Sequence, residues 1–212
     1  MAALNLEEQE QVDALKAWWK ENGKLLLLAL AVVLGSFSAV KGWQHYKDSQ
    51  AAKAAALFGE LNTQLASEDP RRIGDAARAV VEQYGSSAYA PRAQLLAAQA
   101  SIQAKDVAAA KTQLQWVIDH AGEAALKDVA RLKLAALLLD EKDYAGAQAL
   151  LDAPHAESFN GLYADLKGDV MIAQGKKEEA RAAYQQAYEK TDAKNAYRNL
   201  VQMKLDALGG AK

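Results

Sequence analysis

The sequence contains no cysteine. That absence excludes thiol catalysis, disulfide bonds and cysteine-ligated metals, although a cysteine-free chain is at home on either side of a membrane. Proline occurs three times in 212 residues, and no segment alternates apolar and polar residues over the length of a strand. The net charge is -2, so the chain lacks the basic excess that nucleic-acid binding requires. The composition predicts an all-α protein with no nucleic-acid partner.

Residues with catalytic or metal-binding chemistry are also few. None of the three histidines, His45, His120 and His155, has a partner at the spacing of a zinc-binding helix. The sequence has no glycine-rich phosphate loop and no nucleophile elbow. We therefore expect no catalytic residue, no metal site and no cofactor, and we predict that the protein is not an enzyme.

One uncharged apolar run, from Leu25 to Val40, lies between Lys24 and Lys41. At about 1.5 Å per residue the run covers about 24 Å of a hydrocarbon core of roughly 30 Å, so flanking residues must extend it. We predict a single transmembrane helix at 24–46, an N-terminal tail at 1–23 and a soluble domain at 47–212. A buried core helix and a cleaved signal peptide are the alternatives, but the run lacks a polar stripe and follows an acidic 24-residue segment. Lysines on both sides leave the orientation open.

Regular turn signals divide the soluble part into helices of about 12 to 18 residues. When the segments are aligned, Ala109, Ala147 and Ala180 are 38 and 33 residues apart, close to the period of roughly 34 residues of tetratricopeptide repeats. This spacing predicts a tetratricopeptide-like α-solenoid. Its expected parts are repeats near 48–84, 90–120, 128–153 and 161–190 and a capping helix at 193–208.

Small residues are expected where the two helices of each repeat approach each other. The alignment assigns this role to Ala97, Ala135 and Gly168 in the first helices. Gln113 then stands where a bulky apolar residue is usual, which makes the repeat at 90–120 the weaker match. Pro154 predicts that the second helix of the next repeat ends near Asp152.

Two surfaces are candidates for binding. The first helices of stacked repeats line a groove, and the alignment places a set of residues there whose apolar members would bind a peptide and whose two aspartates would disfavour acidic competitors. The set is Gln94, Ala98, Ser101, Leu132, Ala136, Leu139, Leu162, Asp165, Asp169 and Ile172. The alternative for the leucines and isoleucine is packing between helices. On the N-terminal helix, a broad apolar face of Val12, Leu15, Trp18 and Trp19 would contact a partner or the membrane surface.

Three segments carry a resemblance to a known family. They are Glu10-Gln11-Val12 through Asn22-Gly23-Lys24 directly before the span, Ala164-Asp165-Leu166-Lys167-Gly168, and Gln202-Met203-Lys204. Together with the single span and the repeats, they resemble the YfgM family of bacterial inner-membrane proteins over essentially the full chain. The resemblance implies a cytoplasmic N-terminus and a periplasmic repeat domain.

The same resemblance implies an ancillary role at the Sec translocon, with SecYEG and the periplasmic chaperone PpiD as partners. In that role the protein would hold or hand over unfolded secretory polypeptides as they emerge, without catalysis. A tetratricopeptide adaptor that organises another cell-envelope or division complex is the alternative.

Overall fold

The computed structural model describes residues 6–67 and 69–209, which form helices and turns with no strand among them. The chain divides into two compact units, residues 1–50 and 51–212. The all-α class is therefore confirmed. The elements are α1 (Leu6–Leu65), α2 (Pro70–Tyr84), α3 (Tyr89–Gln103), α4 (Val107–His120), α5 (Ala124–Asp140), α6 (Tyr144–Leu151), the 3-10 turn η1 (Glu157–Phe159), α7 (Asn160–Ala173), α8 (Lys177–Lys190) and α9 (Tyr197–Ala207).

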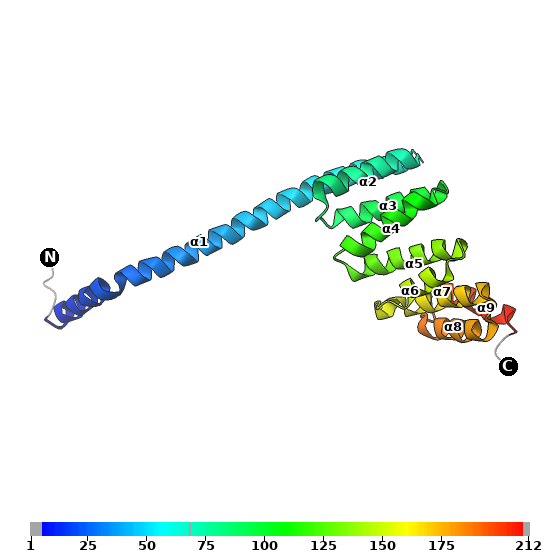
Figure 1. Cartoon of the computed structure of the whole chain (residues 1–212). Coiled ribbons are helices and arrows are strands. Elements are labelled where there is room, and N and C mark those ends of the chain that lie inside the picture. The colour runs from blue at the N-terminus through cyan, green and yellow to red at the C-terminus, as the bar shows by residue number, and fades with distance from the viewer. Residues whose placement is uncertain (1–5, 68, 210–212) are drawn as a thin grey trace. The chain divides into compact units, whose positions relative to one another are not determined.

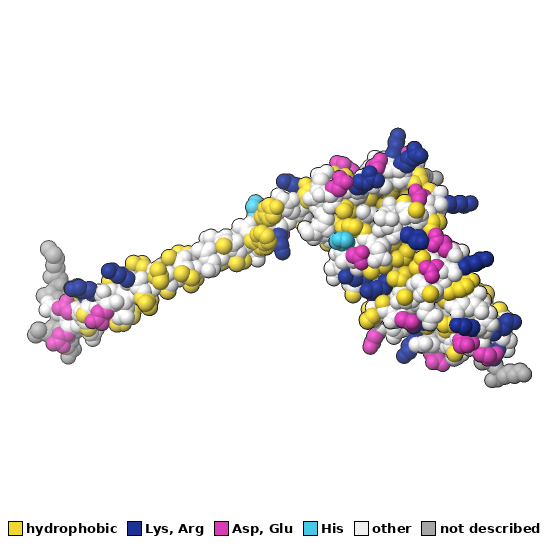
Figure 2. All heavy atoms as spheres, viewed as in Figure 1, with side chains coloured by type: hydrophobic (Ala, Val, Ile, Leu, Met, Phe, Trp, Pro, Cys, Tyr) yellow, Lys and Arg dark blue, Asp and Glu magenta, His cyan; other side chains and the backbone are white. Residues whose placement is uncertain are grey.

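The first unit consists of α1 up to residue 50. Its large apolar side chains between Leu25 and Val40 are 40 to 71% exposed and point to all sides of the helix. This stretch carries no charged side chain (Figure 2). Helix α1 contains the one segment of the described chain that is long and apolar enough to cross a membrane. A single helix with apolar side chains all round has no water-compatible face, which fits a lipid environment.

The second unit is a stack of antiparallel helix pairs (Figure 1). The end of α1 pairs with α2, and α3 with α4, α5 with α6 and α7 with α8 follow as three repeats. The first helices of these repeats lie side by side, because α5 contacts both α3 and α7. Helix α9 packs on α7 and α8, where the first helix of a further repeat would lie, and it buries Val201 and Leu205. A tetratricopeptide-like solenoid with a capping helix is therefore confirmed.

The turns inside the three repeats share one geometry. In each repeat, the turn after the first helix contains a residue with positive φ: Lys105 at 61°, Lys142 at 65° and Gly175 at 77°. The next amide N–H then donates back to a carbonyl five residues earlier, as from Asp106 to Ser101 at 2.8 Å. Asp106 and Asp143 also cap the following helix, since their carboxylates accept from Ala109 N and Gly146 N. These shared turns define the repeat register independently of side-chain type.

This register corrects the sequence alignment by one residue in the first repeat. The turn residues place Ala110 with Ala147 and Ala180, and all three alanines are fully buried, whereas Ala109 is half-buried. The bulky position is Leu114, which is fully buried, and not Gln113. The error arose because alanines occupy 108, 109 and 110, so an alignment by small residues fits equally well one position away. The prediction that the repeat at 90–120 is a weaker match is therefore wrong.

The helix ends lie close to the expected ones. Helix α6 ends at Leu151, one residue before the predicted end, and α9 is shorter at both ends than the predicted cap. Helix α2 begins at Pro70, with Asp69 as its N-cap, and ends at Tyr84, the end of the repeat predicted near 48–84. Helix α1 has no break at the predicted boundary between 46 and 47, and the unit boundary falls at Gln50.

At Gly168, helix α7 packs against α8 and leaves no room for a side chain. A Cβ atom on Gly168 would lie 2.3 Å from Cε1 of Tyr184, far inside van der Waals contact. The Tyr184 ring cannot easily yield, because its hydroxyl donates to Asp169 Oδ1 at 2.8 Å and the residue is 4% exposed. Glycine is therefore required for steric reasons at the crossing of α7 and α8.

We expect Gly168→Ala to lower the free energy of unfolding by about 1 to 3 kcal/mol, because the added methyl group must displace a packed aromatic ring. Gly74→Ala is the matched control. A Cβ there would meet no atom within 4 Å, so a helical alanine should be neutral or stabilise by up to about 1 kcal/mol. Thermal unfolding of both variants measures the difference, and equal stabilities would refute the proposed crossing.

Candidate functional site

The corrected register changes which residues face the groove in the first repeat. Ser101 is buried, 5% exposed, and its hydroxyl donates to Gln113 Oε1 at 3.0 Å inside the helix pair. Ala98 is also fully buried. The prediction that these two residues face the groove is wrong, because they belong to the α3–α4 contact. The residues equivalent to Leu132, Ala136 and Leu139 are Leu95, Gln99 and Ile102, one position after those expected.

The other predicted residues divide by exposure. Leu162 and Ile172 are open, at 37 and 38% exposed, while Leu132 and Leu139 are half-buried against the cluster that joins the second and third repeats. Gln94 is half-buried and aligns with Ala164, which is buried in the third repeat. The structure thus favours packing between helices for the covered part of the Leu132 and Leu139 side chains.

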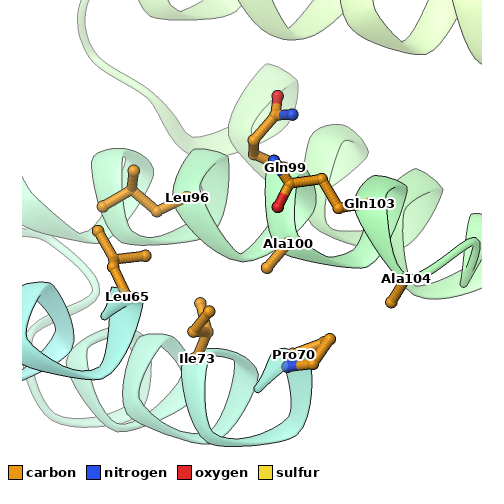
Figure 3. A pocket seen from close by; sticks show the side chains of 8 residues that line it. All are labelled: Leu65, Pro70, Ile73, Leu96, Gln99, Ala100, Gln103 and Ala104. Carbon is orange, nitrogen blue, oxygen red and sulfur yellow. The ribbon is translucent and has the colours of Figure 1, made fainter. Parts of the chain in front are cut away.

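A groove runs along α3, made of two adjoining hollows that share Leu96 and Gln99. The larger hollow, about 640 Å³, opens between the end of α1, the start of α2 and α3 (Figure 3). It is lined by Leu65, Pro70, Ile73, Leu96, Gln99, Ala100, Gln103 and Ala104. The smaller, about 380 Å³, is lined by Phe58, Arg92, Leu95, Leu96, Gln99 and Lys133. We call the two hollows together the α3 groove.

Most side chains that line the α3 groove are apolar, and the polar ones are Arg92, Gln99, Gln103 and Lys133. In Figure 3, Leu65 and Ile73 reach the hollow from one side, and Leu96 reaches it from α3 on the other. Lys133 projects from α5 and donates from Nζ to Gln99 Oε1 at 2.8 Å. Such a surface, apolar with a few directed polar groups, is typical of peptide-binding grooves.

Sequence reasoning placed a groove on the first helices but missed most of its lining. Phe58, Leu96 and Lys133 were not among the candidates, because Phe58 lies in α1 and the other two fall one residue after the groove positions Leu95 and Leu132. The recurring turn corrects the register itself, since Lys-Asp at 105–106 and 142–143 aligns the first two repeats without reference to alanine.

Asp165 and Asp169 are not the free acidic edge that the sequence suggested. Lys204 of α9 donates from Nζ to both carboxylates of these aspartates, at 2.8 to 2.9 Å. Asp165 is 3% exposed and also accepts from the Tyr197 hydroxyl at 2.5 Å. Asp169 accepts from the Tyr184 hydroxyl. We call these five residues the α9 lock.

The environment of the α9 lock raises the pKa values of Tyr184, Tyr197 and Lys204. Burial, and then the hydrogen bond to Asp169, raise the pKa of Tyr184, and burial with the hydrogen bond to Asp165 does the same for the pKa of Tyr197. Burial alone would lower the pKa of Lys204, but the hydrogen bonds to Asp165 and Asp169 outweigh it, so that this pKa is raised. The ammonium and both phenols are therefore firmly protonated near neutral pH.

A second buried acid, Asp128, organises the loop between α6 and α7. It accepts from Arg131 at 3.0 Å and from the backbone N–H of Ala156 at 3.0 Å. Burial, followed by the charge of Asp128, raises the pKa of Tyr163 to about 12. The His155 ring stacks on Tyr163 with centroids 3.8 Å apart. These contacts hold the loop in place and leave no open site around the carboxylate.

The predicted N-terminal face lies on α1 in the first unit. Val12, Leu15, Trp18 and Trp19 are 39 to 64% exposed, so their apolar surface is available. Trp19 packs along its own helix over Gly23, where a Cβ would lie 3.1 Å from the indole.

The described residues contain no group of three or more His, Asp or Glu side chains arranged to hold a metal ion. The two buried acids of the described chain, Asp128 and Asp165, form ion pairs with Arg131 and Lys204. What the arrangement offers chemically is an apolar groove with a basic rim.

Comparison with known proteins decides the family. The family model described as tetratricopeptide repeat-like domain matches residues 16–210. A Neisseria gonorrhoeae protein named ancillary SecYEG translocon subunit is 33% identical to the chain, over 97% of the chain and 99% of the relative. The chain belongs to the YfgM family.

Further YfgM family relatives of the same name agree. The one from Escherichia coli strain K12 is 31% identical over 95% of the chain and 96% of the relative. The one from Haemophilus influenzae is 28% identical over 97% and 100%. No solved structure is significantly similar to the chain. The resemblance drawn from the three segments is confirmed, and in the structure two of them, around Asp165 and Lys204, meet in the α9 lock.

We expect alkaline pH to loosen the α9 lock. The pKa values of Lys204, Tyr184 and Tyr197 are all raised in the folded state, so their stabilisation is full below the unfolded pKa values of about 10 and is lost as pH rises through the folded values. Between about pH 9 and pH 11.5 the melting temperature should therefore fall by several degrees.

Tyr197→Phe should reduce this alkaline fall, because it removes one phenol that the fold keeps protonated. Tyr89→Phe is the control, since the Tyr89 hydroxyl makes no hydrogen bond within the described chain and its ring rests on Phe58. An alkaline fall of the same size in wild type and Tyr197→Phe would show that Tyr197 does not contribute to it.

Proposed function

We propose that this protein is a non-catalytic, single-pass inner-membrane scaffold of the Sec translocon that links emerging secretory polypeptides to periplasmic chaperones. One observation carries the proposal: the relatives named ancillary SecYEG translocon subunit align over 95 to 97% of the chain, and therefore over span and solenoid together. A tetratricopeptide solenoid alone would not suggest it, because this fold serves many unrelated scaffolds.

SecYEG, which the name of the relatives contains, is the proposed membrane partner. A membrane-anchored chaperone of the PpiD type is the proposed periplasmic partner, as the family resemblance implies. The exposed apolar surface of Leu25 to Val40 supports an intramembrane contact with lipid and with helices of the channel. The α3 groove supports transient binding of an unfolded polypeptide.

Copurification tests the assignment. The full chain, extracted in mild detergent, should bring down Sec channel subunits and a periplasmic chaperone. A photoreactive residue at Gln103 in the α3 groove should crosslink to a chaperone or to a secretory polypeptide, whereas the same probe at the exposed Gln186 of α8 should not. Absence of both Sec subunits and chaperone would reject the proposal. Crosslinks confined to another envelope or division complex would favour the adaptor alternative.

The proposed orientation places the N-terminus in the cytoplasm and the solenoid in the periplasm. Because the chain lacks cysteine, single substitutions report on sidedness. Ser158→Cys in the exposed turn η1 should react with a membrane-impermeant maleimide in intact cells with a permeable outer membrane. Lys16→Cys, exposed on the N-terminal segment, should react after lysis alone. The reverse pattern would put the solenoid in the cytoplasm.

A further inference from the structure

We infer that the α3 groove selects extended peptide segments in which apolar residues are flanked by a carboxylate, and that Lys133 provides this selectivity. The inference rests on the proposed function, because it names the class of polypeptide that the scaffold would bind. It also reverses the preference suggested by the sequence, in which Asp165 and Asp169 would have repelled acidic segments.

The lining of the groove determines the sign of its charge. The residues around both hollows include two basic side chains, Arg92 and Lys133, and no Asp or Glu. Arg92 is neutralised, since its guanidinium forms an ion pair with Glu123 at 2.9 Å. Within the described chain Lys133 forms no ion pair, and its ammonium donates to the neutral amide of Gln99. The positive charge of Lys133 thus remains uncompensated at the edge of an apolar surface.

The two aspartates of the third repeat do not oppose this charge. Lys204 bonds to both of them, and Asp165 is almost completely buried beneath α9. The charge of Lys204 and the burial of Asp165 beneath α9 therefore weaken the repulsion of an acidic ligand by these aspartates. Lys133, in contrast, lines the α3 groove. Neither aspartate lines either hollow of the α3 groove.

The polar groups at the rim suit an extended backbone. Because Gln99 Oε1 accepts from Lys133, the amide NH₂ of Gln99 is left to donate to a carbonyl. Gln103, one turn further along α3, is exposed at the same hollow. A peptide that places a Leu or Phe against Leu65, Ile73 and Leu96 can bond to these amides and reach Lys133 with a neighbouring carboxylate.

Peptide binding to the full chain tests the inference. The protein is placed in nanodiscs of phosphatidylcholine, so that the lipid carries no net charge. The probes are fluorescein-labelled peptides of about twelve residues with a central Leu-Phe-Leu. One carries Asp on both flanks, one carries Lys, and one has the Asp flanks but Ser in place of the apolar residues. We expect the acidic apolar peptide to bind most tightly, by about three- to tenfold over the basic one.

Lys133→Gln should remove this preference. It should weaken binding of the acidic apolar peptide by about three- to tenfold and flatten its salt dependence, while the basic peptide binds no worse. Lys190→Gln is the matched control, because it removes the same charge from the exposed surface of α8. Thermal unfolding confirms that both variants are folded.

Each remaining outcome contradicts the inference. The inference is overturned if the acidic and basic peptides bind equally, or if the basic one binds more tightly. It is also overturned if the serine peptide binds as tightly as the apolar one, if Lys190→Gln has an effect equal to that of Lys133→Gln, or if no peptide binds. Copurification with Sec subunits is independent of these results. If it persists while the peptide preference is absent, the inference fails and the proposed function stands.

Discussion

The close crossing of paired helices is the constraint on which the solenoid depends. In each repeat a residue with little or no side chain, Ala98, Ala135 or Gly168, lies in the first helix, and a bulky one, Leu114, Leu151 or Tyr184, lies in the second. A small residue lets the helix axes approach, and the bulky partner then fills the space that remains. The largest partner, Tyr184, requires the smallest residue, Gly168. Because each repeat contacts only the repeats next to it, a helix pair that crosses at the wrong distance would displace the repeats that follow.

The number and type of helices could be predicted from the sequence because turns and apolar runs are local signals. The inter-helix turns at Lys105, Lys142 and Gly175 fall inside the repeats predicted near 90–120, 128–153 and 161–190. Side-chain register was less accessible, because in an alanine-rich chain a small residue is available one position on either side. The error of one residue rotates a helix face by about 100°, enough to exchange the groove lining for the core. This is why Ser101 was placed in the groove. Lys133 was missed for another reason: its repeat was in register, but it lies one residue after Leu132 and so outside the positions assigned to the groove.

The α9 lock shows a second limit of sequence reasoning. Lys204 lies 39 residues from Asp165 and 35 from Asp169, and nothing local signals that they meet. Two aspartates read from the sequence look like a solvated acidic edge, which is the commoner environment for such residues. Beside a lysine and two tyrosines, the buried Asp165 and the half-buried Asp169 instead hold the terminal helix in place. A buried carboxylate requires such partners, because without them its desolvation would destabilise the fold.

A shallow groove with one uncompensated lysine is suited to weak binding, and weak binding is what the proposed role requires. A polypeptide in transit must be released as readily as it is captured, so a deep, fully enclosed pocket would impede it. Anchoring offsets the low affinity, because a domain tethered to the membrane beside a channel meets each emerging segment at a high effective concentration. In the proposed role the transmembrane span and the α3 groove therefore act together. The span keeps the domain where polypeptide segments emerge, and Lys133 with its apolar neighbours gives a modest preference among those segments. On this view, strengthening the groove would impair the scaffold, since slower release would retain polypeptides at the channel exit.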